Sequence, residues 1–219
     1  MTVPDTRSLA QLATAAAGCT MCELYEAASQ TVFGEGPRSA EIMLVGEQPG
    51  DVEDRRGQVF VGPAGHMLDR VLEEAGLDRD RLYLTNAVKH FRWTPAPRGK
   101  RRLHQRPAGS HIVACEPWLA AELRAVRPRV VVALGAVAGQ ALFGSSFSVT
   151  RSRGAPLPWP PAAGPFADTR LAIEHAFATI HPSAILRGPD DERTARRRVM
   201  VADLVAVREL SGKGTGQVV

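Results

Sequence analysis

Short apolar runs alternate with longer amphipathic segments along most of the chain. Four runs are short and end at glycine or a polar residue, which predicts buried strands at 41–45, 81–85, 130–134 and 176–180. Apolar residues at helical spacing predict helices at 8–17, 64–75, 112–126, 136–143 and 192–210. Because strands and helices alternate, we expect an α/β fold with a parallel sheet that is covered on both faces.

Polar side chains follow three of the predicted strands, at the point where each strand ends. The loop GEQPGD follows the first strand and carries Glu47, Gln48 and Asp51. Asn86 follows the second strand, and His181 follows the fourth. Ligands of open α/β sheets bind beyond the carboxyl ends of the strands, so we expect these side chains to gather at one rim. Taken singly, the acids also fit helix caps, and Asn86 also fits a turn residue.

The segment GKRRLHQRP carries one histidine, His104, among four cations, which are Lys100, Arg101, Arg102 and Arg106. No acidic residue occurs between positions 89 and 114. Glycine and proline at its ends predict a loop, and its single sign of charge predicts contact with a polyanion. A solvated basic loop and a localisation signal are the alternatives for such a run taken alone.

The composition is that of one ordinary globular domain. The chain has 219 residues, is 44% hydrophobic and 23% charged, and carries a net charge of +4. We interpret 1–210 as a single domain with a basic insert at 91–111, and we expect 211–219 to be disordered. Five prolines between 151 and 165 predict an irregular surface segment. The modest positive charge makes nucleic acid one candidate partner among several.

The amino-terminal residues lack a basic start followed by a sustained apolar run, so we expect no signal peptide. No later apolar run approaches the roughly 18 residues that a membrane span requires. We therefore expect a cytoplasmic protein that does not contact membranes.

The three cysteines, Cys19, Cys22 and Cys115, cannot all pair, which argues against a disulfide framework. Cys19 and Cys22 form a C-x-x-C motif, a spacing that lets two thiolates reach one metal centre. The residues alone allow a zinc site, an iron–sulfur cluster or a redox pair. A fourth metal ligand would have to come from elsewhere in the chain.

Five motifs together resemble the family-4 uracil-DNA glycosylases: GEQPGD, GQVFVGPAG, NAVKH, KRRLH and HPSAILR. The resemblance covers about residues 15–210. It is closest to the UdgX branch, whose members become covalently crosslinked to uracil-containing DNA. Glutamine in the first loop, His90 in place of a cysteine and the basic loop with its histidine are the features typical of that branch. Leu103, where isoleucine is usual, and the proline-rich stretch depart from it.

The resemblance implies a three-layer α/β/α sandwich around a four-stranded parallel sheet, and a 4Fe-4S cluster. By position, the cluster ligands would be Cys19, Cys22, His90 and Cys115. The cluster would tie the amino-terminal segment to the basic insert, and a redox role stays open. Without the resemblance, His90 also fits a loop histidine that donates to a carbonyl group.

For the base pocket, the resemblance implies that Phe60 stacks on uracil and that Asn86 pairs with its O4 and N3–H. Gln48 and Gly46 would frame the same pocket. Phe60 lies between two valines, so it also fits a core residue.

For cleavage of the glycosidic bond, the resemblance implies that His181 donates to uracil O2, where negative charge develops. Glu47, together with Asp51, would place negative charge near the sugar or take a proton from the attacking group.

In the UdgX branch the attacking group would be His104, which would bond as a neutral imidazole to C1′ of the deoxyribose. Arg102, with Arg101, would hold flanking phosphates and aim His104, and its charge would help keep that ring neutral. The residues expected to contact the DNA strand are Lys100, Arg101, Ser183, Leu186 and Arg187. Leu186 also fits simple packing at the start of a helix.

Three functions are therefore compared. The first is a single-turnover uracil-DNA glycosylase that becomes crosslinked to DNA. The second is a glycosylase with multiple turnovers, in which the basic loop adds only affinity. The third is a non-catalytic iron–sulfur protein that binds nucleic acid. We favour the first, with uracil-containing DNA as partner, single strands preferred, and the protein acting as a monomer.

Overall fold

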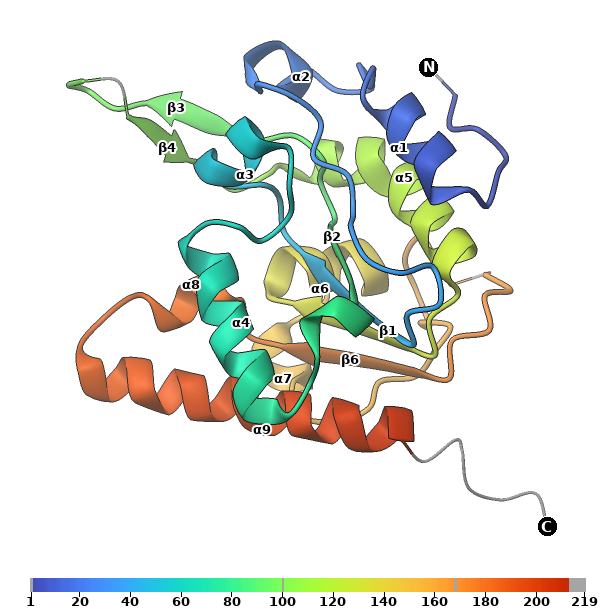
Figure 1. Ribbon diagram of the computed structural model, residues 1–219, viewed down its shortest axis with the longest axis vertical. Helices are drawn as coiled ribbons and strands as arrows, with labels where there is room; N and C mark the ends of the chain where they lie inside the picture. Colours follow the sequence, from blue (N-terminus) through green and yellow to red (C-terminus); the bar gives the residue numbers. More distant parts are fainter. Residues whose placement is uncertain (1, 100, 168, 213–219) are drawn as a thin grey trace.

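The centre of the fold is a parallel sheet with the strand order β2-β1-β5-β6 (Figure 1). The structure is a computed structural model that describes residues 2–99, 101–167 and 169–212. The strands are β1 (Ile42–Gly46), β2 (Tyr83–Asn86), β5 (Val130–Leu134) and β6 (His175–Thr179). All four predicted strands are confirmed, with small shifts at their ends.

The strands read as continuous apolar runs because both faces of the sheet are covered. Every residue of β1 and β5 is buried. Successive side chains point to opposite faces, so Ile42 and Leu44 pack in one core cluster while Met43 and Val45 pack in another.

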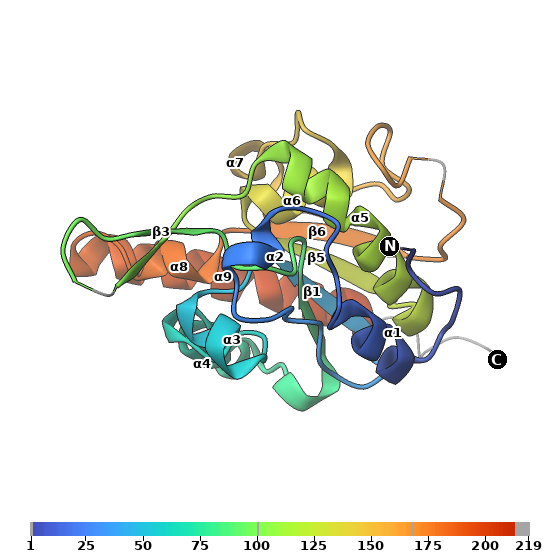
Figure 2. The same ribbon diagram turned by 90° about the horizontal axis from the view of Figure 1, so that it is seen from above.

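Helices cover the two faces of the sheet and complete a three-layer α/β/α architecture (Figures 1 and 2). One face packs against α4 (Pro63–Ala75), α8 (Pro182–Ile185) and α9 (Asp190–Gly212). The other face packs against α5 (Gly109–Val126) and α6 (Ala136–Phe143), and α1 (Leu9–Ala16) packs on α5. Within the described ranges, no helix has both the length and the apolar character of a membrane span.

The predicted helices are confirmed, but five short ones were not predicted. These are α2 (Leu24–Ala27), α3 (Asp51–Arg56), the 3-10 helix η1 (Arg79–Arg81), α7 (Val149–Ser152) and α8. Each is too short for a periodic pattern. The predicted disordered tail began at 211, whereas α9 runs to Gly212, and 213–219 lie outside the described residues.

The proline-rich stretch is irregular, but it also packs onto the fold. The Leu157 N–H donates to the Ala176 carbonyl of β6 at 2.7 Å. The rings of Trp159 and Phe166 lie 5.7 Å apart, and both residues pack in the core beneath α5 and α6. The expectation of an irregular surface segment is confirmed, because most of residues 151–165 are exposed, and the half-buried Trp159 attaches the segment to the core.

The basic loop is an antiparallel hairpin made of β3 (Trp93–Pro95) and β4 (Arg102–His104). Trp93 pairs with His104, and Pro95 pairs with Arg102. The hairpin projects from the body of the molecule (Figures 1 and 2). The prediction of a loop was wrong here, because three-residue strands carry too little pattern to be recognised. Lys100 lies outside the described residues.

Leu44→Ala tests the central position of β1 in the core. Leu44 is fully buried, so its truncation leaves a cavity and should lower the free energy of unfolding by about 2–5 kcal/mol. Val113→Ala is the control, because that side chain is 66% exposed and its loss should cost less than about 0.5 kcal/mol. Urea denaturation followed by circular dichroism measures both, and equal effects would contradict the assignment of the core.

Candidate active site

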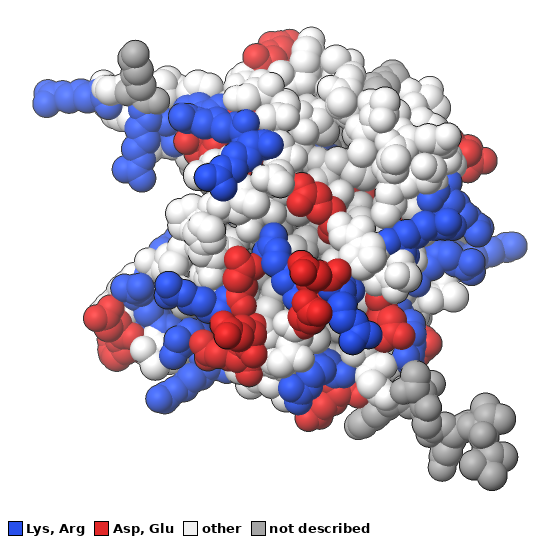
Figure 3. All heavy atoms as spheres, in the orientation of Figure 1, with Lys and Arg blue, Asp and Glu red and all other residues white. Residues whose placement is uncertain are grey.

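A hollow of about 720 Å³ opens beyond the carboxyl ends of the strands and under the hairpin. Figure 3 shows Lys and Arg side chains on the hairpin and a hollowed surface below it. The predicted site residues that line this hollow are Glu47, Gln48, Asp51, Phe60, Asn86, Arg101, Arg102, His104, His181, Ser183, Leu186 and Arg187. The structure therefore brings the expected residues to one rim of the sheet. Their roles in chemistry stay predictions.

Phe60 and Asn86 line the hollow, and Gly46 packs against both of them. A Cβ atom at Gly46 would lie 2.3 Å from Asn86 Oδ1 and 2.6 Å from Phe60 Cζ, so the close packing requires glycine there. Phe60 has a positive φ of 53°, which is uncommon for a bulky residue, and Arg79 donates to its carbonyl oxygen at 3.3 Å. Phe60 is both a core residue and a lining residue.

His181 caps α8 and is held in one tautomer by Ser183. The Ser183 N–H donates to His181 Nδ1 at 3.2 Å, and the Ser183 hydroxyl lies 2.8 Å from the same nitrogen. Since Nδ1 accepts, the ring proton is on Nε2. Burial, with smaller contributions from His104 and Arg187, lowers the pKa of His181 to about 4. At neutral pH this ring is therefore uncharged and carries an Nε2–H donor.

Gln48 orients His104. Its Oε1 accepts the Arg92 N–H at 3.1 Å, which leaves its Nε2 to donate to Gln105 O at 2.9 Å. The same Nε2 lies 2.9 Å from His104 Nε2. An amide nitrogen only donates, so His104 Nε2 accepts and keeps its lone pair. Burial and then the charge of Arg187 lower the pKa of His104, which favours the neutral ring.

Glu47 supplies the carboxylate that faces this ring. Its Oε1 lies 3.6 Å from His104 Nε2. Burial raises the pKa of Glu47, and the charges of Arg106 and Arg187 offset part of this effect. Negative charge and a nitrogen lone pair thus face the same space.

Two ion pairs, which we call the hairpin latch, join the hairpin to α3. Arg102 donates to Asp51, and its Nη1 lies 2.7 Å from the buried Asp54 Oδ2. The guanidinium carbon also lies 5.3 Å from the Phe91 ring centre and 5.4 Å from that of Trp93. Sequence reasoning missed Asp54, although its i+3 spacing from Asp51 places both carboxylates on one side of a helix.

The latch changes the interpretation of two predicted residues. We expected Arg102 to hold phosphate and to keep His104 neutral. Its side chain is only 11% exposed and is neutralised by carboxylates, and the cation that lowers the pKa of His104 is Arg187. Asp51 forms ion pairs with Arg102 and Arg55. Of the two acids expected near the sugar, Glu47 is therefore the one that faces His104.

The remaining expected DNA contacts lie at the mouth of the hollow. Arg101, Leu186 and Arg187 are exposed there, and within the described chain neither arginine forms an ion pair. Ser183 lines the hollow, but its hydroxyl is used by His181. These positions fit contact with a strand entering the hollow.

Behind Asn86, a fully buried ion pair holds the loop between β2 and the hairpin. Lys89 Nζ lies 2.5 Å from Glu122 Oε2, and both side chains are 0% exposed. Lys89 also donates to the Asn86 carbonyl and to Thr85 Oγ1, each at 2.7 Å. This pair fixes the backbone of the loop that starts at Asn86 and ends at His90.

The four expected cluster ligands lie near the base of the hairpin insert, but they do not all meet. Cys22 and Cys115 share a hydrogen bond, which lowers the pKa of Cys22 to about 6. Cys19 packs separately, with its sulfur 3.2 Å from Trp118 Nε1. Among the residues described, no group of three or more His, Cys, Asp or Glu side chains is arranged to hold a single metal ion.

His90 nevertheless has the features of a ligand. Its Nε2 lies 2.9 Å from Thr31 Oγ1, and its Nδ1 is buried with no hydrogen-bond partner. Burial lowers its pKa, which favours the neutral ring that binds metals. A ligating histidine usually donates its other N–H to a fixed acceptor, and Thr31 is placed to accept it. The unpartnered Nδ1 of His90 therefore fits the role of a metal ligand.

Comparison with known proteins identifies the family. The model of the uracil DNA glycosylase superfamily matches residues 33–205. The type-4 uracil-DNA glycosylase of Sulfurisphaera tokodaii is 33% identical over 198 residues, which cover 88% of this chain and 80% of the relative. The type-4 enzyme of Thermotoga maritima is 34% identical over 187 residues, which cover 85% of each chain. Together with the α/β/α fold and the hollow at the strand ends, these matches show that the chain belongs to the uracil-DNA glycosylase superfamily.

Proposed function

We propose that this protein removes uracil from DNA and that His104 then bonds covalently to C1′ of the exposed deoxyribose, so that each molecule acts once. We infer uracil excision because its relatives are named type-4 uracil-DNA glycosylases. The covalent step is carried by one observation: His104 Nε2, which accepts from Gln48 and so carries no proton, lines the hollow 3.6 Å from the Glu47 carboxylate. A hydrolytic enzyme needs no nucleophilic side chain there.

The first step is recognition of a flipped nucleotide. Extrusion from a stack costs a few kcal/mol, and the cost is least in single strands, which is why we expect these to be preferred. Phe60 offers a ring face on which uracil stacks. The Asn86 side chain offers an NH₂ group that donates to uracil O4 and a carbonyl oxygen that accepts from N3–H. The Lys89–Glu122 pair holds the Asn86 backbone in place for this contact.

The second step breaks the bond between uracil N1 and C1′. The bonding electron pair leaves with uracil, so negative charge develops on the base and positive charge on the sugar. His181 carries an Nε2–H donor for uracil O2, and the fixed dipole needs no reorganisation as charge develops. The Glu47 carboxylate, which lines the same hollow, stabilises the cationic sugar.

The third step joins the protein to the DNA. The lone pair of His104 Nε2 forms a bond to C1′, which gives an imidazolium ring and a free uracil anion. The Nδ1 proton is then lost to solvent, and uracil takes up a proton from solvent, so charge and atoms balance. The latch keeps the hairpin over the sugar and limits access of water, so the adduct persists.

We also propose a 4Fe-4S cluster held by Cys19, Cys22, His90 and Cys115. The unpartnered Nδ1 of His90 and the adjacent thiols of Cys22 and Cys115 support it. Such a cluster supplies a structural tie between the amino-terminal segment, the 86–90 loop and α5, and the excision steps use none of its chemistry.

His104→Ala tests the covalent step. Without the ring, water reaches C1′, so we expect the crosslinked band to disappear and free abasic product to form. The assay incubates protein with a uracil-containing single strand, treats part of the sample with alkali to cut abasic sites, and separates products on a denaturing gel. Leu103→Ala is the matched control on the same strand and should keep the band. A band that survives in His104→Ala would exclude this nucleophile.

The pH profile tests Glu47. Burial raises the pKa of Glu47, so its carboxylate takes up a proton at a higher pH than an exposed glutamate does. Excision should slow as the pH falls through this raised pKa. The pKa of His104 is lowered from 6.5, so the fraction of product that is crosslinked should stay constant as pH falls through 6.5. Single-turnover rates on quenched gels measure both. Glu47→Gln should be slow and should lack the acidic limb, and an unchanged limb in that variant would assign it to another group.

Metal analysis tests the cluster independently of activity. Protein purified without oxygen should contain iron and sulfide in equal amounts, with broad visible absorption. Cys115→Ser should lose both, because it removes a buried ligand, whereas Met21→Ala, between the two amino-terminal cysteines, should keep them. Wild-type protein that contains no iron after purification without oxygen would reject the cluster, and uracil excision by that protein would leave the excision proposal standing.

A further inference from the structure

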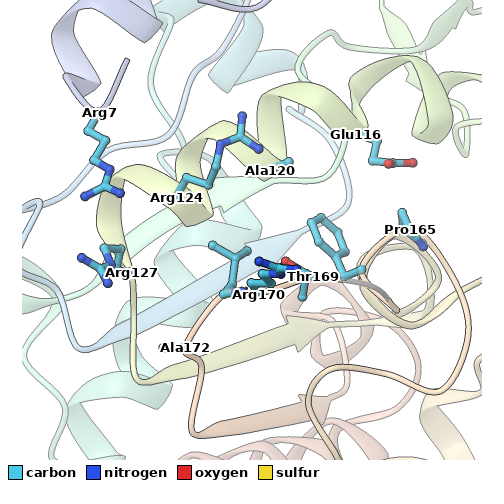
Figure 4. Close-up of a pocket in the computed structure, with 11 residues that line it drawn as sticks. Arg7, Glu116, Ala120, Arg124, Arg127, Pro165, Thr169, Arg170 and Ala172 are labelled. Carbon is cyan, nitrogen blue, oxygen red and sulfur yellow. Dashed lines mark hydrogen bonds between the residues drawn. The ribbon is translucent and has the colours of Figure 1, made fainter. Parts of the chain in front are cut away.

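A second hollow, of about 450 Å³, shares no lining residue with the candidate active site (Figure 4). It is lined by the last turns of α5 and by the segment that precedes β6. The active-site hollow lies beyond the carboxyl ends of the strands, whereas this one lies beside their amino ends. The two therefore cannot share one bound nucleotide.

Four arginines line this hollow, and we call it the arginine pocket: Arg7, Arg124, Arg127 and Arg170. Within the described part of the chain, none of their guanidinium groups has a hydrogen bond or an ion pair. Arg129, three residues beyond the end of α5, differs, because it pairs with Glu174 at 2.7 Å. Among the described residues, the charges in the pocket thus lack carboxylate partners, whereas the neighbouring Arg129 has one.

Helix stability explains only part of this cluster. A cation in the last turn of a helix is favourable, which accounts for Arg124 in α5. Arg7 comes from the amino-terminal segment and Arg170 from the segment before β6, so neither gains from that dipole. The four arginines are exposed to solvent, and like charges that line one hollow repel one another, so a bound anion would reduce the repulsion.

The opposite end of the pocket has a different character. Glu116 precedes Arg124 by eight residues on the same helix, which is a separation of about 12 Å at 1.5 Å per residue. Figure 4 shows Glu116 and Pro165 toward one end and Arg7, Arg124 and Arg127 toward the other. Phe166 and Leu171 form an apolar wall of the pocket. Within the described chain, the Glu116 carboxylate has no hydrogen-bond partner.

We propose that the arginine pocket binds a mononucleotide, with its phosphate at the arginines and its base along the apolar wall toward Glu116. A carboxylate at that end accepts hydrogen bonds from the amino or hydroxyl groups of such a ligand. An inorganic phosphate would leave the wall and Glu116 unused. The volume lies within the range of small-molecule pockets, about 300–1,000 Å³. The proposal does not depend on uracil excision.

Calorimetric titration with adenosine 5′-monophosphate tests the proposal, with adenosine and inorganic phosphate titrated separately. We expect the nucleotide to bind more tightly than either part. Arg124→Gln should weaken nucleotide binding about tenfold or more, because it removes a charged donor. Glu116→Gln should weaken binding of the nucleotide but not of phosphate. Arg70→Gln is the matched control, because Arg70 is an exposed arginine of α4 outside the pocket.

Ala120→Phe is a second variant that fills the pocket without changing its charge, and it should also abolish binding. If Arg124→Gln lowers the unfolding temperature, the Ala120→Phe variant tests nucleotide binding in its place. Absence of nucleotide binding, or equal affinities in Arg124→Gln and Arg70→Gln, would overturn the proposal. So would a loss of affinity for a uracil-free single strand in Arg124→Gln without any nucleotide binding, because the arginines would then contact a DNA strand.

Discussion

The ion pairs of Arg102 with Asp51 and Asp54 are the interaction on which the geometry of the site depends. A two-stranded hairpin is marginally stable alone, so its position over the hollow has to come from contacts with the body. Asp54 is fully buried, and Arg102 is largely shielded from solvent, so this contact is screened less than a surface ion pair. His104 lies two residues beyond Arg102 on the same strand and inherits its position.

Around this anchored histidine, electrostatics separate the roles of the ionisable groups. Burial lowers the pKa of both histidines and raises that of Glu47, and Arg187 acts on all three. Both rings are therefore neutral, but their hydrogen bonds orient them differently. His181 accepts from Ser183 and presents an N–H donor, whereas His104 accepts from Gln48 at Nε2, which therefore carries no proton. One neutral ring can therefore act on the leaving base and the other on the sugar.

The sheet and the rim of polar residues could be predicted from the sequence because both depend on residues that are close together in the chain. Buried strands give continuous apolar runs, and the residues that follow them must lie at one edge. The hairpin and the latch could not be predicted this way, since Asp54 and Arg102 are far apart in the chain and meet only in the fold. Glu122 carried a visible signal, because it is an acid on the apolar face of α5 beside Leu119 and Leu123.

The buried pair of Lys89 and Glu122 has a consequence for how the sequence can vary. Removing one partner would leave an uncompensated charge in the interior, at a cost of about 3–5 kcal/mol, whereas replacing both with apolar residues can be neutral. The two positions are therefore expected to covary across the superfamily, present together or absent together. Chains that lack the pair would need another means of fixing the carbonyl of Asn86.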